Sequence, residues 1–225
     1  MRKKHTSREY ESELKDLKSQ LATMAYDVKA MIHDSMNALQ KKDIKLAEEV
    51  IERDFYINQI ELEIDEFCLI ILARRQPLAK DLRFITIALK MVTDLERMGD
   101  MTVSIARRVI KLQKMPPVKI PDKILLMAKS VQEMLQLAIE SLLESDATKA
   151  DQVLEQDDSV DELYHQNFRY LIKLMAQNEN LIEPLVHLQS VAKWLERLGD
   201  HCTNLAEFVV FKVSGENVRH VSRAK

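Results

Sequence analysis

The chain carries two nearly identical six-residue segments, LERMGD at 95–100 and LERLGD at 195–200. These segments contain Gly99 and Gly199, two of only three glycines among 225 residues. A glycine inside a helix costs about 1 kcal/mol relative to alanine, so both positions need a reason to keep it. The repeated glycines predict a close approach of a neighbouring helix in each copy.

The repeated segment belongs to a longer duplicated unit. Residues 24–58 align without a gap to residues 127–161. The offset is 103 residues in this alignment and 100 residues at the LERxGD segments, so the first unit has three extra residues, near 74–81. The sequence is therefore a tandem duplication with one local insertion, which we expect to fall in a loop.

The pattern within each unit is helical. Apolar residues recur every three or four positions from Leu14 to Met31, as in a bundle helix. Asp43 and Asp146 each follow a polar break and precede a fresh periodic run, as helix N-caps do. With only 3 glycines and 5 prolines, the chain has few of the turns that many short strands require. We predict an all-α fold of two tandem antiparallel three-helix bundles.

Prolines and polar stretches suggest the boundaries of the units. We expect the second helix to end near Arg75, before Pro77, and the last helix to begin near Pro184. The predicted organisation is a first unit at 1–115, a proline-containing linker at 116–123, a second unit at 124–213 and a polar tail at 214–225.

Each LERxGD segment places a glutamate and an aspartate four residues apart, on one helix face. The preceding helix of each unit adds a second polar pair at the same spacing. If these two helices pack antiparallel with the pairs abreast, each unit gathers four oxygen-bearing side chains. The candidate metal ligands are Asp54, Asn58, Glu96 and Asp100 in the first unit and Asp157, Asp161, Glu196 and Asp200 in the second. So many carboxylates cannot all stay ionised together without a cation or raised pKa values.

Oxygen ligands favour magnesium, manganese, calcium or iron, and make zinc less expected. His201 follows Asp200 directly but points elsewhere on a helix, so we interpret it as a surface or packing residue. The alternative is that the acidic pairs lie on solvated faces and the glycines only allow close packing. Glu61 and Asp65 show that such spacing also arises by chance in a chain so rich in charge.

Several function classes are disfavoured. The net charge of -3 and pI near 6.1, with no basic patch, argue against nucleic-acid binding. The apolar run at 67–73 is far shorter than the roughly 20 residues of a membrane span, and the first residues do not form a secretory signal. Two cysteines provide no disulfide framework, so we expect a cytoplasmic protein.

We also expect no enzymatic activity. The chain contains no glycine-rich phosphate loop and no grouped nucleophile. A carboxylate-bridged di-metal oxidoreductase is the rival interpretation, but it usually requires Glu-x-x-His pairs, which neither motif contains. A metal-free helical scaffold is the third alternative.

The segments ARRQPLAKDLRF at 73–84, DLERMGD at 94–100 and KWLERLGDHCTNLAEF at 193–208 resemble the PhoU family of phosphate-signalling regulators. The resemblance implies two three-helix bundles whose E(D)xxxD motifs bind multinuclear metal clusters, with iron favoured and zinc, manganese or magnesium as alternatives. By resemblance, the motif ligands are Glu96, Asp100, Glu196 and Asp200, together with Asp54, Asp157 and Asp161. Asn58 departs from the acidic pattern, which predicts a weaker or smaller metal site in the first unit.

The same resemblance implies a cytoplasmic negative regulator of the phosphate-starvation response. It would act at the inner face of the membrane, between the phosphate transporter ATPase and a sensor histidine kinase, which is compatible with peripheral membrane association. The long methionine-rich helices leave apolar surface that a homodimer could cover. In the segment 73–84, Arg74 and Arg75 would complement the dipole at a helix end, although a partner-binding role stays open.

Overall fold

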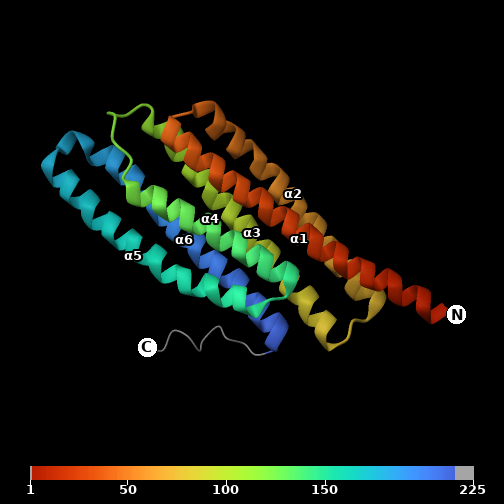
Figure 1. Cartoon of the computed structure of the whole chain (residues 1–225). Helices are drawn as coiled ribbons and strands as arrows, with labels where there is room; N and C mark the ends of the chain where they lie inside the picture. Colours follow the sequence, from red (N-terminus) through yellow and green to blue (C-terminus); the bar gives the residue numbers. More distant parts are fainter. Residues whose placement is uncertain (1, 216–225) are drawn as a thin grey trace.

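The computed structural model describes residues 2–215, which form six long α-helices and one short 3-10 helix (Figure 1). The bounds of these elements are α1 Arg2–Lys41, α2 Ile44–Arg75, α3 Ala79–Leu112, α4 Asp122–Glu144, α5 Ala147–Gln177, η1 Glu179–Leu181 and α6 Ile182–Ser214. No strand is present among these described residues. The predicted all-α fold and the end of the second helix at Arg75 are confirmed.

The two predicted N-caps are also confirmed. The Asp43 side chain accepts a hydrogen bond from the Leu46 backbone N–H at 3.0 Å. The Asp146 side chain accepts from the backbone N–H groups of Thr148 at 2.8 Å and Lys149 at 3.4 Å. Both carboxylates therefore satisfy helix donors that have no partner within the helix.

The helix boundaries differ slightly from the predicted unit boundaries. α4 begins at Asp122, two residues earlier than the predicted second unit, because Pro121 has the extended backbone of an N-cap. α6 continues to Ser214, where the predicted polar tail was to begin, and Gly215 adopts a left-handed conformation after it. Residues 216–225 of that predicted tail lie outside the described part of the chain.

Arg75 fastens the end of α2 to α1. Its guanidinium donates to both carboxylate oxygens of Glu13, at 2.8 and 2.7 Å, and lies 3.0 Å from a Glu9 oxygen. These contacts raise the Arg75 pKa further above its usual range. Arg75 therefore has a structural role at this helix end, as an ion-pair partner of α1, and its predicted effect on the helix dipole stays a prediction.

The two three-helix bundles lie side by side along their length rather than being separated by the linker. Figure 1 shows α2 and α5 at opposite sides, with α1 and α4 between them and α3 and α6 behind. α1 contacts α4, and α3 contacts α6, so each bundle contributes two helices to the junction. The apolar core is continuous through both bundles, and α3 and α6 bury more side chains than the other helices.

Polar contacts connect both pairs of helices at this junction. Between α1 and α4, Lys29 donates to Gln136 at 2.7 Å. Between α3 and α6, His201 Nδ1 lies 2.8 Å from Asp94 Oδ1, and both side chains are nearly buried. His201 thus joins the two bundles, which agrees with the second of the two predicted roles, a surface or a packing residue.

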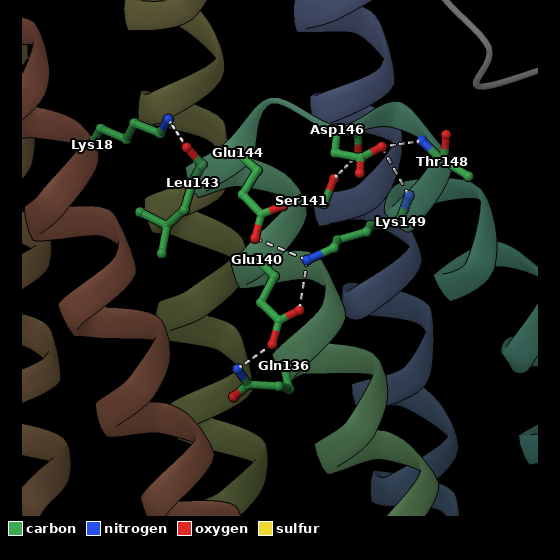
Figure 2. A network of polar contacts seen from close by, with 9 residues as sticks. All are labelled: Lys18, Gln136, Glu140, Ser141, Leu143, Glu144, Asp146, Thr148 and Lys149. Carbon is green, nitrogen blue, oxygen red and sulfur yellow. Dashed lines mark hydrogen bonds and ion pairs between the residues drawn. The ribbon is translucent and has the colours of Figure 1, made fainter.

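The end of α4 is held by a local network (Figure 2). Lys149 Nζ lies 2.9 Å from carboxylate oxygens of both Glu140 and Glu144. Lys18 of α1 donates to the backbone carbonyl of Leu143, which lies in the last turn of α4 and has no N–H donor within the helix. The network connects α1, α4 and α5 at one end of the molecule.

Candidate metal centre

The repeated glycines lie where α2 meets α3 and where α5 meets α6. A Cβ atom placed on Gly99 would lie 3.2 Å from Asp54 Oδ1, and one on Gly199 would lie 3.1 Å from Asp157 Oδ1. Both distances are tighter than ordinary van der Waals contact. In each half, therefore, the absent side chain makes room for an aspartate of the neighbouring helix. The sequence prediction that these helix levels lie abreast is confirmed.

In the first half this contact gathers several acidic groups. Burial is the main cause that raises the pKa of Asp54, and the charge of Asp100 adds to it. The pKa of Glu96 is raised by burial first, then by Asp100, Glu61 and Asp54. Asp100 itself is exposed. Each carboxylate thus makes ionisation of the others less favourable, as expected for like charges in one site.

Two oxygen atoms of this site lack hydrogen-bond partners. Asp54 Oδ1 and Asn58 Oδ1 are buried and accept no hydrogen bond from the described residues. The Asn58 amide donates to the Asp54 carboxylate, which partly offsets the rise of the Asp54 pKa. A buried acceptor without a partner is costly, so both oxygens are suited to a cation or a donor from outside the chain.

Glu61 is a member of this site that sequence reasoning missed. Its pKa is raised by burial first, then by the charges of Asp65 and Asp100. Glu61 follows Asn58 by three residues and Asp54 by seven, a spacing that places all three on one helix face. That spacing was the available signal, but the pair Glu61 and Asp65 was interpreted as accidental.

The second half keeps the aspartate–glycine contact but neutralises part of the charge. Glu196 is held by Lys193, whose Nζ lies 2.6 Å from both carboxylate oxygens. The pKa of Asp161 is raised by burial first and by Glu196 next, whereas His165 and Lys193 act in the opposite direction. The second site therefore contains its own counter-charges.

Asp157 and Asp200 complete the second set. Asp157 lies against Gly199, and its charge adds to the effect of burial in raising the pKa of the Cys202 thiol. Asp200 follows Gly199 on α6, and its backbone carbonyl accepts a hydrogen bond from Thr203 at 2.7 Å. All four predicted residues of this half come from the facing helices α5 and α6.

The oxygen donors fit a hard or borderline cation by chemical type. Their side chains, however, do not form a closed ligand set. Within residues 8–215, no group of three or more His, Cys, Asp or Glu side chains is positioned to hold a metal ion. Binding would require side-chain rotation. The predicted ligand role of the eight residues therefore stays a prediction.

The fold and the repeated contact define a duplicated three-helix-bundle protein with an acidic contact in each half. The sequence model of the PhoU domain matches residues 21–109 and 124–209. The chain belongs to the PhoU family. Its relatives are accessory proteins of phosphate transport rather than enzymes. None of the helices within the described residues is long and apolar enough to cross a membrane.

Individual relatives match nearly the whole chain. A phosphate-specific transport system accessory protein PhoU homolog of Aquifex aeolicus is 40% identical over 92% of this chain and 94% of its own length. The Escherichia coli accessory protein PhoU is 32% identical over 97% of this chain and 90% of its own length.

Solved structures show the same architecture. The crystal structure of PhoU from Pseudomonas aeruginosa has a TM-score of 0.88 and 38% identity, covering 92% of this chain and 100% of that one. The phosphate transport system regulatory protein PhoU from Streptococcus pneumoniae has a TM-score of 0.87 and 29% identity, covering 93% of this chain and 99% of that one. The chain is therefore related to accessory proteins of phosphate transport in both sequence and fold.

Proposed function

We propose that this protein is a cytoplasmic, metal-binding negative regulator of phosphate uptake and phosphate-starvation signalling. Its partners would be the phosphate transporter ATPase and a sensor histidine kinase, with the protein acting as a homodimer beside the membrane. The role in phosphate transport is supported by the names of relatives that align with nearly the whole chain, and the regulatory role by the name of the Streptococcus pneumoniae protein. The partners and the dimer are expectations from the family.

The metal-binding part of the proposal is supported mainly by one observation. In both halves an aspartate oxygen fills the space over a helix glycine, and at Asp54 that oxygen has no hydrogen-bond partner among the described residues. The donors would be Asp54, Asn58, Glu96 and Asp100, with Glu61, in the first half, and the four predicted residues in the second. A bound cation would offset their mutual repulsion and hold the two helices of each pair together.

Elemental analysis of protein purified without an affinity metal column tests this proposal. We expect the variant Glu196→Ala with Asp200→Ala to lose the metal of the second half, and Asp54→Asn with Glu96→Gln to lose that of the first. The matched control is Glu52→Gln with Glu155→Gln, because both residues are exposed, lie on α2 and α5, which each contribute two predicted ligands, and recur in the two units. Metal content that does not change in the site variants would refute the ligand assignment.

The second candidate is a metal-free helical regulator. It is favoured by the lack of a preformed group of three ligating side chains within residues 8–215. In that case wild-type protein would contain no stoichiometric metal, and a chelator would not change its melting temperature.

The regulatory role has its own test in cells. In a strain that lacks its accessory protein, expression of this chain should lower the activity of a starvation-responsive promoter when phosphate is plentiful. Persistent high promoter activity, with normal protein levels, would argue against negative regulation. Because the site variants can be compared in the same strain, the assay also separates regulation from metal binding.

A further inference from the structure

A groove of about 620 Å³ runs between α1 and α2 of the first half. Its floor on the α2 side consists of the partly buried Ile60, Phe67 and Ile70, and its rim carries the exposed carboxylates Glu63 and Glu66. The α1 side is formed by residues with small or polar side chains, namely Ser19, Gln20 and Thr23. Apolar residues at the bottom, carboxylates at the edge and small or polar side chains on α1 leave room for a bulky, positively charged ligand.

The groove occupies a different face of α2 from the acidic contact with α3. At 100° per residue, Ile60, Glu63 and Phe67 point away from the face that carries Asp54 and Asn58. Between the two faces lies an exposed apolar crest. Its members, Phe55, Leu62 and Leu69, are 63%, 67% and 61% exposed.

The charged side chains that α2 contributes to this surface have one sign. From Asp54 to Leu69, α2 contains five acidic residues and no lysine, arginine or histidine. Within the described part of the chain, neither Glu63 nor Glu66 forms an ion pair. These two carboxylates are therefore available to cations from another molecule.

The duplicated half provides an internal comparison. With the offset of 103 residues, Glu63 and Glu66 correspond to Gln166 and Arg169, and Ile70 corresponds to Lys173. The crest residue Leu62 corresponds to His165. The same helical scaffold therefore folds without an acidic rim, so packing within the bundle does not require Glu63 and Glu66.

Two occupants are disfavoured by the same charges. An anionic lipid surface would be repelled by the carboxylates of α2. A second copy of the chain could dock through α2, which is equally acidic. It could also dock through α5, but the cationic Arg169 and Lys173 of that helix follow four acidic residues between 157 and 162. Repulsion by those four residues would oppose docking along the groove.

We propose that the groove between α1 and α2 binds a cationic amphipathic helix of another protein. Its apolar residues would pack on Ile60, Phe67 and Ile70, and its lysines or arginines would meet Glu63 and Glu66. Because a helix rises 1.5 Å per residue, about 14 residues would cover the length from Phe55 to Leu69.

A synthetic Leu/Lys peptide of about 14 residues, with leucines on one helix face, serves as the probe. Its binding to the whole protein is measured by fluorescence anisotropy at several NaCl concentrations. We expect saturable binding that weakens with salt, and a loss of about tenfold or more in affinity for Glu63→Gln with Glu66→Gln. The matched control, Glu48→Gln with Glu52→Gln, removes two exposed carboxylates of the same helix outside the groove and should leave binding unchanged.

A second variant blocks the groove without altering its charges on α2. Thr23→Arg places a large cation in the groove, and Thr86→Arg is its control, since both threonines are exposed and donate to the carbonyl four residues earlier. Only Thr23→Arg should abolish binding. Equal binding of a peptide with the same composition but scrambled leucine spacing would overturn the proposal. Two other results would also overturn it. One is self-association of the protein that changes in the variant Glu63→Gln with Glu66→Gln, and the other is attachment to anionic vesicles that changes in the same variant.

Discussion

The two halves of this protein share one backbone contact but have different charges around it. In both halves an aspartate oxygen covers a glycine of the facing helix, at nearly the same distance. In the first half Glu61 adds a carboxylate, whereas the corresponding residue of the second half is Tyr164. In the second half Lys193 binds Glu196, whereas the corresponding residue of the first half is Thr93. The duplication has kept the packing and changed the electrostatics.

This comparison revises one expectation about the first site. Asn58 was expected to weaken it, because an amide replaces a carboxylate of the family pattern. Glu61 supplies another carboxylate to the same site, and the cations that act against the raised pKa values there are arginines, Arg107 on Asp54 and Arg97 on Glu96. If metal binds, we therefore expect Glu61 to offset part of the loss that Asn58 causes in the first site.

The largest effect should come from filling the glycine positions. Gly99→Leu and Gly199→Leu should each destabilise the protein by about 1–3 kcal/mol, because the new side chain must displace Asp54 and Ile57, or Asp157 and Val160. Gly→Ala should cost much less, since better helix propensity offsets the tight contact. Urea denaturation measures both. A large loss in one half only would show that the two contacts are not equivalent.

Exchanging the residue types at positions 93 and 193 should change the metal affinity of the two proposed sites in opposite directions. Thr93→Lys should weaken metal binding in the first half by about tenfold, or about 1.4 kcal/mol, by placing a cation near Glu96. Lys193→Thr should strengthen binding in the second half, since Glu196 loses its partner. Metal titration of each variant, with the other site removed, provides the measurement. If neither affinity changes, Lys193 does not compete with metal.

The metal-free protein should become less stable as the pH rises through the raised pKa values of Asp54 and Glu96. The folded state holds these protons more tightly than the unfolded state does. For Asp54, this contribution to stability is complete below the ordinary pKa of 3.8 and is lost as the pH rises above the raised pKa of the folded state. Thermal melts of wild type and of Asp54→Asn with Glu96→Gln, both in chelator, should differ in slope against pH. Parallel slopes would contradict the assigned shifts.

The smallest effect concerns the helix caps. Asp43→Ala and Asp146→Ala should each cost about 1 kcal/mol, with the larger loss at Asp146 because it accepts from two backbone N–H groups rather than one. Urea denaturation of both variants would detect the difference. A larger loss at Asp43 would mean that the second hydrogen bond adds nothing.

Local patterns were sufficient to predict most of the fold. The caps at Asp43 and Asp146, the end of α2 before Pro77 and the facing levels of Asp54 and Gly99 all depend on neighbouring residues or on the repeat. The site was harder to predict, because it depends on which side chains of two helices actually meet. The pairing of Glu196 with Lys193 has the spacing of an ordinary helix ion pair and did not stand out.

The contact between the halves could not be predicted from periodicity. Asp94 and His201 are separated by more than a hundred residues, and neither belongs to the repeated pattern, since their counterparts are Trp194 and Met101. Nothing in either unit alone indicates a partner for these side chains. Their meeting follows from how the two bundles dock, which is a property of the assembled molecule.

The bond between Asp94 and His201 has a mechanical consequence for the molecule. Asp94 precedes Glu96 on α3 by two residues, and His201 follows Glu196 on α6 by five. Any turn of α3 about its own axis that moves Glu96 relative to α2 must also move Asp94, and the bond transmits that motion to α6. A rotation of either helix is therefore coupled to the other through this contact, whereas a change of side-chain rotamer within one acidic cluster is not.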